Sequence, residues 1–175
     1  MASLMYRPFM QTMLAPGNAA NGHGGLTLDL LGGGDLSGSG EDTGTSVLGA
    51  LLVDDVGGYT FSADHAWVSD LGTNVVANGG GSGTGAEEGE LQNMQLRNSN
   101  SGVALDADDL TMTGVGDGVE SVNAIVIAVL VSDSGDENPL VCHIDTGTGF
   151  DFVPNASTVT ITWAGADDYI FSIGA

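Results

Sequence analysis

The residues of this chain that could act as nucleophiles, bases or zinc ligands are one cysteine and three histidines, namely Cys142, His23, His65 and His143. No two histidines stand four residues apart, the spacing that places two metal ligands on one helix face. Cys142 and His143 are neighbours in an apolar run, and adjacent residues of a strand point to opposite faces. A Cys–His nucleophile pair is therefore not expected. A zinc site is not expected either, because such sites usually use several cysteines.

One acidic residue stands beside a histidine, at Asp64 and His65, and this pair has the types of a base and the group that orients it. No nucleophile follows nearby in a recognisable strand–turn–helix elbow. The glycine runs at residues 32–34 and 79–81 lack the Lys-Ser/Thr pair that completes a phosphate-binding loop. We therefore expect no enzymatic activity.

Two carboxylate clusters offer the oxygen ligands that Ca²⁺ prefers, and both fall in predicted turns. The first is Asp106, Asp108 and Asp109, and the second includes Asp133 and Asp136. Neither follows the twelve-residue EF-hand pattern. Such clusters arise readily in a chain with 23 acidic residues. Solvated turns are the simpler interpretation, binding of calcium or other salt cations is the alternative, and no further cofactor is expected.

The charge of the chain is strongly one-sided. Arg7 and Arg97 are its only Lys or Arg residues, against 23 acidic residues, so the formal net charge is −21. This charge produces strong self-repulsion in dilute buffer, whereas at about 1 M salt the Debye length falls to roughly 3 Å and screens most of it. We interpret the acidic surface as an adaptation to concentrated salt. Binding to nucleic acid or to an anionic membrane is not expected, because almost no cations are present to neutralise phosphates.

Two apolar runs form the predicted centre of the fold. The first, within residues 121–131, includes eight consecutive apolar residues, many of them β-branched, which favours a strand covered on both faces. The second run covers residues 140–145, and the Gly/Asp/Asn/Pro segment 132–139 between them is typical of a hairpin tip. The first run is too short to span a membrane as a helix, which takes about 18 or more apolar residues.

Shorter strands are predicted around this hairpin, together with a helical turn at residues 62–71. The strands are expected at residues 26–30, 46–53, 90–97, 103–113 (strand, turn, strand), 158–163 and 169–173, and residues 59–61 are expected to be short and extended. Short strands separated by Gly, Asp and Asn turns predict an all-β fold. We expect an antiparallel β-sandwich or barrel over residues 18–175, with glycine-rich loops at 32–45 and 78–89.

Residues 1–17 are predicted to form a short N-terminal helix or arm. Pro8 suits the first turn of a helix, so a helix over residues 8–15 would follow an extended segment. The apolar side chains of this segment either pack into the core of the chain or dock on a neighbouring subunit. In the second case deletion of residues 1–11 leaves a folded domain, and the partner-binding anchors are Met5, Tyr6, Phe9 and Met10.

Several short segments resemble a family of small virion proteins of tailed phages. The pattern MASLMYRPFMQ at residues 1–11 resembles the start of these proteins. The same order of features continues at residues 59–65, 105–111, 139–147, 159–163 and 170–173. The chain departs from the pattern in its two glycine-rich loops and its lack of Lys, as expected for a virus of a haloarchaeal host. The resemblance carries over no catalytic residue.

The resemblance implies a structural role, with localisation in the virion. A β domain of this kind would act as a capsid decoration or cement protein, binding the major capsid protein or other virion proteins and forming a homo-oligomer. A neck, tail or fibre component of the same particle is the alternative. A third interpretation comes from the Asp-rich turns alone, and is a secreted calcium-dependent binding module.

Overall fold

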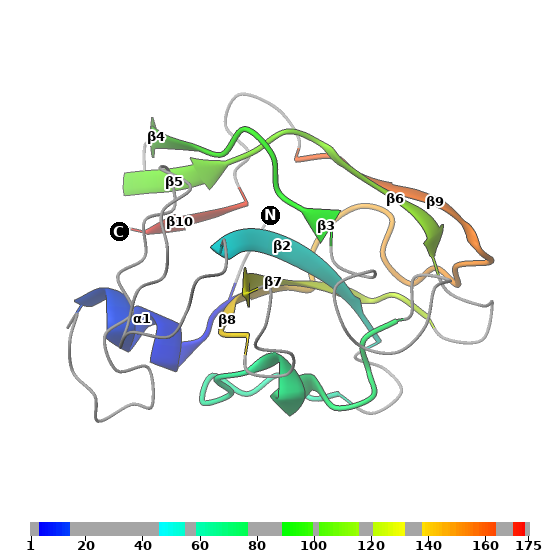
Figure 1. Cartoon of the computed structure of the whole chain (residues 1–175), viewed down its shortest axis with the longest axis horizontal. Helices are drawn as coiled ribbons and strands as arrows, with labels where there is room; N and C mark the ends of the chain where they lie inside the picture. The colour runs from blue at the N-terminus through cyan, green and yellow to red at the C-terminus, as the bar shows by residue number, and fades with distance from the viewer. Residues whose placement is uncertain are drawn as a thin grey trace.

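The regular secondary structure in the described part of the chain consists mainly of antiparallel strands (Figure 1). A computed structural model describes residues 4–14, 46–54, 59–76, 89–99, 102–115, 121–131, 138–163 and 170–173. The strands are β1 (Leu4–Met5), β2 (Ser46–Val53), β3 (Gly89–Glu90), β4 (Gln95–Ser99), β5 (Gly102–Asp106), β6 (Leu110–Val115), β7 (Ala124–Val131), β8 (Leu140–Ile144), β9 (Ser157–Ile161) and β10 (Phe171–Ile173). An α-helix, α1 (Arg7–Leu14), and a 3₁₀ helix, η2 (Val68–Leu71), complete the described elements.

The described strands form three sheets. A five-stranded sheet has the order β1-β8-β7-β2-β3, a three-stranded sheet the order β10-β5-β4, and β6 pairs with β9. All pairings among these described strands are antiparallel. The predicted all-β antiparallel fold is confirmed, whereas the choice between a sandwich and a barrel stays a prediction. Among the described residues, no helix is both long enough and apolar enough to cross a membrane.

The predicted central hairpin is present as β7 and β8. These strands pair antiparallel, with Ile125 opposite Ile144 and Ile127 opposite Cys142. On its other side β7 pairs with all eight residues of β2, the strand predicted at residues 46–53. Residues 132–137 of the predicted hairpin tip lie outside the described residues.

The five-stranded sheet is buried on both faces, as its apolar central strand predicts. Successive residues of β7 alternate between two hydrophobic clusters. Ile125, Ile127 and Val129 pack in the larger cluster, whereas Ala124, Val126 and Ala128 pack in the smaller one. The bulkier face lies against the sheets of β5 and β6, and the face with the small alanines lies against residues 59–71 (Figure 1).

The N-terminal segment is an integral part of this fold. β1 pairs with β8, and the Tyr6 amide donates a hydrogen bond of 3.1 Å to the Val141 carbonyl. Pro8 lies in the first turn of α1, as predicted. The side chains of Tyr6 and Phe9 are buried within this chain. The prediction that these two side chains anchor a partner is therefore wrong, because the chain itself removes them from solvent.

Local conformation changes three other predicted elements. The strand expected at residues 90–97 is two strands, β3 and β4, separated at Asn93, whose φ of 51° is left-handed. The strands expected within residues 103–113 are present as β5 and β6, but they belong to different sheets. The helical turn expected at residues 62–71 shortens to η2. The strand predicted at residues 26–30 and the loop at 32–45 lie outside the described residues, as do residues 78–88 of the second loop.

Gly89 joins two of the sheets by a close approach. A Cβ atom at this position would lie 2.9 Å from Leu110 Cγ and would overlap the ends of that side chain. Only glycine leaves room for the Leu110 side chain of β6 to pack against β3. The absence of one side chain therefore brings the two-stranded sheet onto the edge of the five-stranded sheet.

Candidate functional site

A chain of polar side chains lies where the N-terminal segment meets residues 59–71. The Tyr6 and Tyr59 hydroxyl groups are 2.8 Å apart and share a hydrogen bond. The Tyr59 hydroxyl also lies 3.2 Å from His65 Nδ1. Both tyrosines are buried, and His65 is half-buried. Three hydrogen-bonding groups thus lead from the core toward the surface, and we take this tyrosine–histidine cluster as the candidate site.

Aromatic rings enclose the cluster. The Phe61 ring centroid lies 5.2 Å from that of Tyr6 and 5.1 Å from that of His143, in tilted arrangements. The His143 ring also lies 5.9 Å from the Tyr59 ring. His143 faces this cluster, whereas Cys142 packs in the larger hydrophobic cluster on the other face of the sheet. The predicted opposite orientation of Cys142 and His143 is confirmed.

Burial keeps the tyrosines of this cluster protonated. Burial raises the pKa of Tyr6, and its hydrogen bond with Tyr59 raises it further. Burial also raises the pKa of Tyr59, although the hydrogen bond from Tyr6 acts in the opposite direction. Burial likewise raises the pKa of the Cys142 thiol. All three groups are neutral near pH 7, so none of them is an activated nucleophile or base there.

The neighbouring residues Asp64 and His65 make different contacts. Arg7 makes an ion pair with Asp64, and both side chains are exposed. The Arg7 amide donates to the Ala63 carbonyl at 2.7 Å, so this contact joins the start of α1 to the 59–71 segment. His65 turns instead toward Tyr59. The two groups that could have formed a base and its orienter therefore serve different contacts.

Asp70 holds the local fold of the segment that carries His65. Its carboxylate accepts hydrogen bonds from the Ala66 and Trp67 amides, at 2.8 Å and 3.0 Å. Partial burial of Asp70 acts to raise its pKa. The two amides and the nearby His65 outweigh burial, and the pKa of Asp70 lies below its ordinary value. Its negative charge is therefore used to organise the turn that begins η2.

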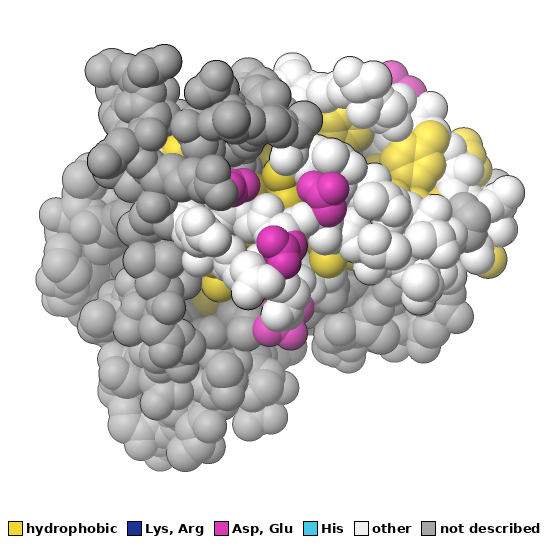
Figure 2. All heavy atoms as spheres, turned by 90° about the horizontal axis from the view of Figure 1, so that it is seen from above, with side chains coloured by type: hydrophobic (Ala, Val, Ile, Leu, Met, Phe, Trp, Pro, Cys, Tyr) yellow, Lys and Arg dark blue, Asp and Glu magenta, His cyan; other side chains and the backbone are white. Residues whose placement is uncertain are grey.

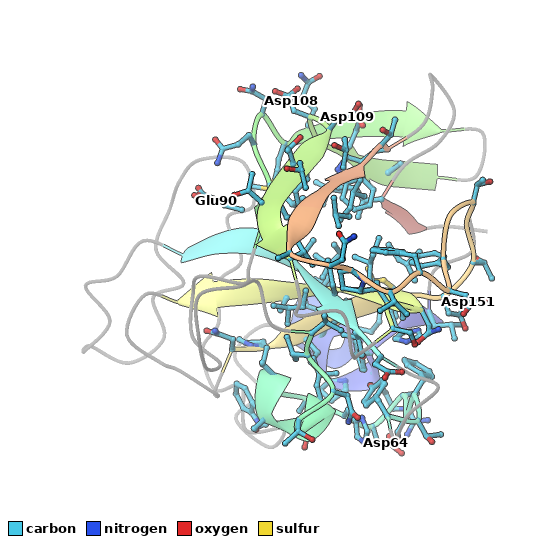
Figure 3. The ribbon with its side chains drawn as sticks, turned by 90° about the vertical axis from the view of Figure 1, so that its right-hand side faces the viewer. Asp64, Glu90, Asp108, Asp109 and Asp151 are labelled. Atoms are coloured by element: carbon cyan, nitrogen blue, oxygen red, sulfur yellow. The ribbon has the colours of Figure 1, made fainter. Side chains whose placement is uncertain are left out.

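The carboxylates predicted as calcium ligands serve separate hydrogen bonds. Oδ1 of Asp106 accepts from the Ala107 amide at 3.0 Å. Oδ2 of Asp108 accepts from the Asn93 side chain at 2.6 Å, and Oδ1 of Asp109 accepts from the Trp163 amide at 3.1 Å. Figure 3 shows Asp108 and Asp109 at the opposite end of the molecule from Asp64.

These carboxylates are the predicted cation ligands of the first Asp-rich turn. Within the part of the chain that the structure describes, no group of three His, Cys, Asp or Glu side chains is placed to hold a metal ion. Binding of calcium or another cation by Asp106, Asp108 and Asp109 therefore stays a prediction, and the contacts in the structure show only what each carboxylate bonds within the chain. Asp133 and Asp136 of the second cluster lie outside the described residues.

Two of the predicted partner anchors keep some exposed surface. Met5 is half-buried and packs against the larger cluster, and Met10 is also half-buried. The most exposed apolar side chain described in this segment is Leu4, at 45%. Sequence reasoning missed Leu4 because a two-residue strand has no periodicity to show which side chain faces solvent. It also missed the Tyr6–Tyr59 bond, since those residues are 53 positions apart.

No family model, curated protein or solved structure matches this chain. The tyrosine–histidine cluster is therefore interpreted from its own geometry. Its hydroxyls are neutral, enclosed by aromatic rings and bonded to one another. Such a cluster is suited to fixing two segments of the chain together.

Proposed function

We propose that this protein is a structural component of a tailed-virus particle, acting as a capsid decoration or cement protein that stabilises the shell in concentrated salt. The observation that carries the proposal is that the side chains able to do chemistry hold segments of the described fold together. The Tyr6–Tyr59–His65 chain and the Asp70 carboxylate are engaged in contacts that hold segments together. A protein of this kind acts by presenting surfaces to partners.

The sequence supports the same proposal in two ways. Short segments spread over the chain resemble small virion proteins of tailed phages. In addition, a net charge of −21 keeps a surface hydrated and dispersed in brine, where the charges are screened. The partners are then the major capsid protein and further copies of this chain. Leu4, Met5 and Met10 remain as side chains through which the N-terminal segment contacts a neighbouring subunit.

Quantitative mass spectrometry of purified particles tests this function. A copy number comparable with that of the major capsid protein supports a decoration protein on the shell. A copy number equal to that of one ring of subunits assigns the protein to the neck or tail of the same particle. Complete absence from particles of a virus that encodes the chain overturns the proposal.

A further inference from the structure

The hydrogen bonds of the tyrosine–histidine cluster have a direction that depends on the charge of His65. Tyr6 is 0% exposed, and the partner of its hydroxyl group among the described residues is the Tyr59 hydroxyl, at 2.8 Å. The Tyr59 hydroxyl in turn lies 3.2 Å from His65 Nδ1. A neutral histidine with its proton on Nε2 presents Nδ1 as an acceptor. Tyr59 then donates to His65 and Tyr6 donates to Tyr59, so both buried hydroxyl protons are used.

A proton added to His65 reverses this chain of bonds. Both ring nitrogens of a charged histidine are donors, so Nδ1 no longer accepts a bond from Tyr59. Tyr59 accepts from His65 instead and turns its own proton toward the Tyr6 oxygen. The Tyr6 proton then lacks the acceptor that Tyr59 provided. A buried donor without an acceptor is strongly unfavourable, because water cannot replace the lost partner.

His65 is placed where solvent can protonate it. Its side chain is half-buried, whereas both tyrosines are buried. The Asp70 carboxylate, which accepts from the Ala66 and Trp67 amides, interacts electrostatically with His65. The negative charge of Asp70 is therefore positioned to attract an imidazolium ion at residue 65.

The other titratable and charged groups around the cluster are engaged elsewhere or face away. Asp64 is exposed and forms an ion pair with Arg7. From β8, His143 lies beneath the Tyr59 ring, with 5.9 Å between the ring centroids, whereas Cys142 packs on the other face of the sheet. The acidic side chains visible in Figure 2 lie on the side of the molecule turned away from residues 59–71.

We propose that protonation of His65 in mildly acidic solution reverses the hydroxyl chain and loosens β1 and α1, so that the tyrosine–histidine cluster is an acid-sensitive switch. Tyr6 connects these two elements. Its amide donates to the Val141 carbonyl at 3.1 Å, and its carbonyl accepts from the Met10 amide at 3.2 Å. A change at the Tyr6 side chain therefore acts on the strand and the helix together. The switch is a property of the isolated chain and goes beyond the proposed function.

Hydrogen–deuterium exchange of the full chain, read by mass spectrometry, tests the switch. Measurements at about pH 8 and about pH 5 span the range in which histidine ordinarily takes up a proton. About 3 M NaCl screens repulsion among the carboxylates. Protection factors, which correct for the effect of pH on intrinsic exchange, report how often each segment opens. From pH 8 to pH 5 we expect those of β1 and α1 to fall about tenfold and those of β7 to change less than about twofold.

Two variants separate the hydroxyl chain from other effects of the histidine charge. His65→Asn removes the titrating ring. Tyr59→Phe keeps His65 beside Asp70 but breaks its connection to Tyr6. In both variants the loss of protection of β1 and α1 on acidification should be less than about twofold. Each protein is compared with itself at the higher pH, so a lower overall stability of Tyr59→Phe does not affect the result.

The matched control is His143→Phe, which removes the other histidine in contact with Tyr59 and keeps a ring beside Phe61. This variant should retain the acid response. Circular dichroism at the higher pH confirms the fold of each variant, and His65→Asn alone decides the test if Tyr59→Phe does not fold.

Five results overturn the switch. The first two concern the unmodified chain: equal protection of β1 and α1 at both pH values, and an equal fall in β7, which would mean that acid opens the whole fold. The third and fourth are a full acid response in His65→Asn and a full acid response in Tyr59→Phe. The fifth is loss of the response in His143→Phe, which would make that histidine the titrating group.

Discussion

The hydroxyl groups of Tyr6 and Tyr59 lie 2.8 Å apart inside the protein, although 53 positions separate the two residues. The bond joins the N-terminal segment to the segment that covers the small-residue face of the central sheet. Both side chains are buried, so water cannot replace a lost partner. The contact therefore fixes the position of β1 and α1 relative to the rest of the fold.

Tyr6→Phe removes this hydrogen bond and keeps the ring. We expect the free energy of unfolding to fall by about 1 kcal/mol, the usual net value of one buried hydrogen bond, because Tyr59 keeps His65 as a partner. Tyr6→Ala also empties the ring's volume and is expected to cost about 3–5 kcal/mol. Urea denaturation in concentrated salt measures both values. Equal stability of Tyr6→Phe and the unmodified chain would show that the bond contributes nothing.

Deletion of residues 1–11 tests the N-terminal segment as a whole. The deletion removes β1 from the edge of the five-stranded sheet and takes two buried aromatic side chains out of the core. We expect a chain that is unfolded, or that lacks a cooperative thermal transition, even at high salt. Circular dichroism and thermal melts measure this outcome. A truncated chain that melts cooperatively at the original temperature contradicts the structural role of the segment.

Alkaline pH should weaken the fold through the buried tyrosines. In the unfolded chain a tyrosine ionises near its ordinary pKa of about 10, whereas burial raises the pKa of Tyr6 and Tyr59 in the folded chain. The unfolded state therefore loses protons first, and stability falls as the pH rises above about 10. The chain has no lysine whose titration would obscure this window. Urea midpoints measured across it should fall.

The Tyr6→Phe variant isolates the tyrosine contribution to that pH dependence. Its stability should fall less steeply than that of the unmodified chain above pH 10, since one shifted group is gone. Burial also raises the pKa of Cys142, but that contribution is common to both proteins and cancels in the comparison. Parallel pH profiles for the two proteins would contradict the prediction.

Gly89→Ala should destabilise the junction between two sheets. The added methyl group would overlap the Leu110 side chain, and overpacking of this kind typically costs about 1–3 kcal/mol. The double variant Gly89→Ala/Leu110→Ala removes the clash, so its cost should be smaller than the sum of the two single changes. Gly149→Ala is the control, because a Cβ there meets no atom within 4 Å and probes only backbone strain. Additive costs at Gly89 and Leu110 would rule out the close approach.

Strong local patterns in the sequence were enough to predict the centre of the fold. The bounds of β2 and the pairing of β7 with β8 follow from apolar runs and the turn residues beside them. The alternation of side chains also predicted that Cys142 and His143 face opposite ways. These features depend on neighbours in sequence, which is the information that a periodic pattern carries.

Long-range pairing could not be predicted in the same way. β5 and β6 are consecutive, yet β5 pairs with β4 and β10 while β6 pairs with β9. The carboxylates of Asp108 and Asp109 look like calcium ligands in sequence, but their hydrogen-bond donors are the distant Asn93 side chain and Trp163 amide. The role of a carboxylate depends on which donor it bonds, and the fold decides which donors lie within reach.

Salt should stabilise this protein steeply. Acidic residues number 23 against two arginines, so folding brings many like charges together. Screening at molar salt relieves that repulsion, and the Tm should rise between about 0.1 and about 3 M NaCl. The variant Glu90→Gln/Asp145→Asn removes two exposed carboxylates and should raise the Tm at low salt while making the rise shallower. Salt effects on apolar burial are shared by both proteins, so the difference in slope reports repulsion alone. A flat Tm over this range would mean that the carboxylates are already tolerated in dilute buffer and that the acidic surface is no adaptation to brine.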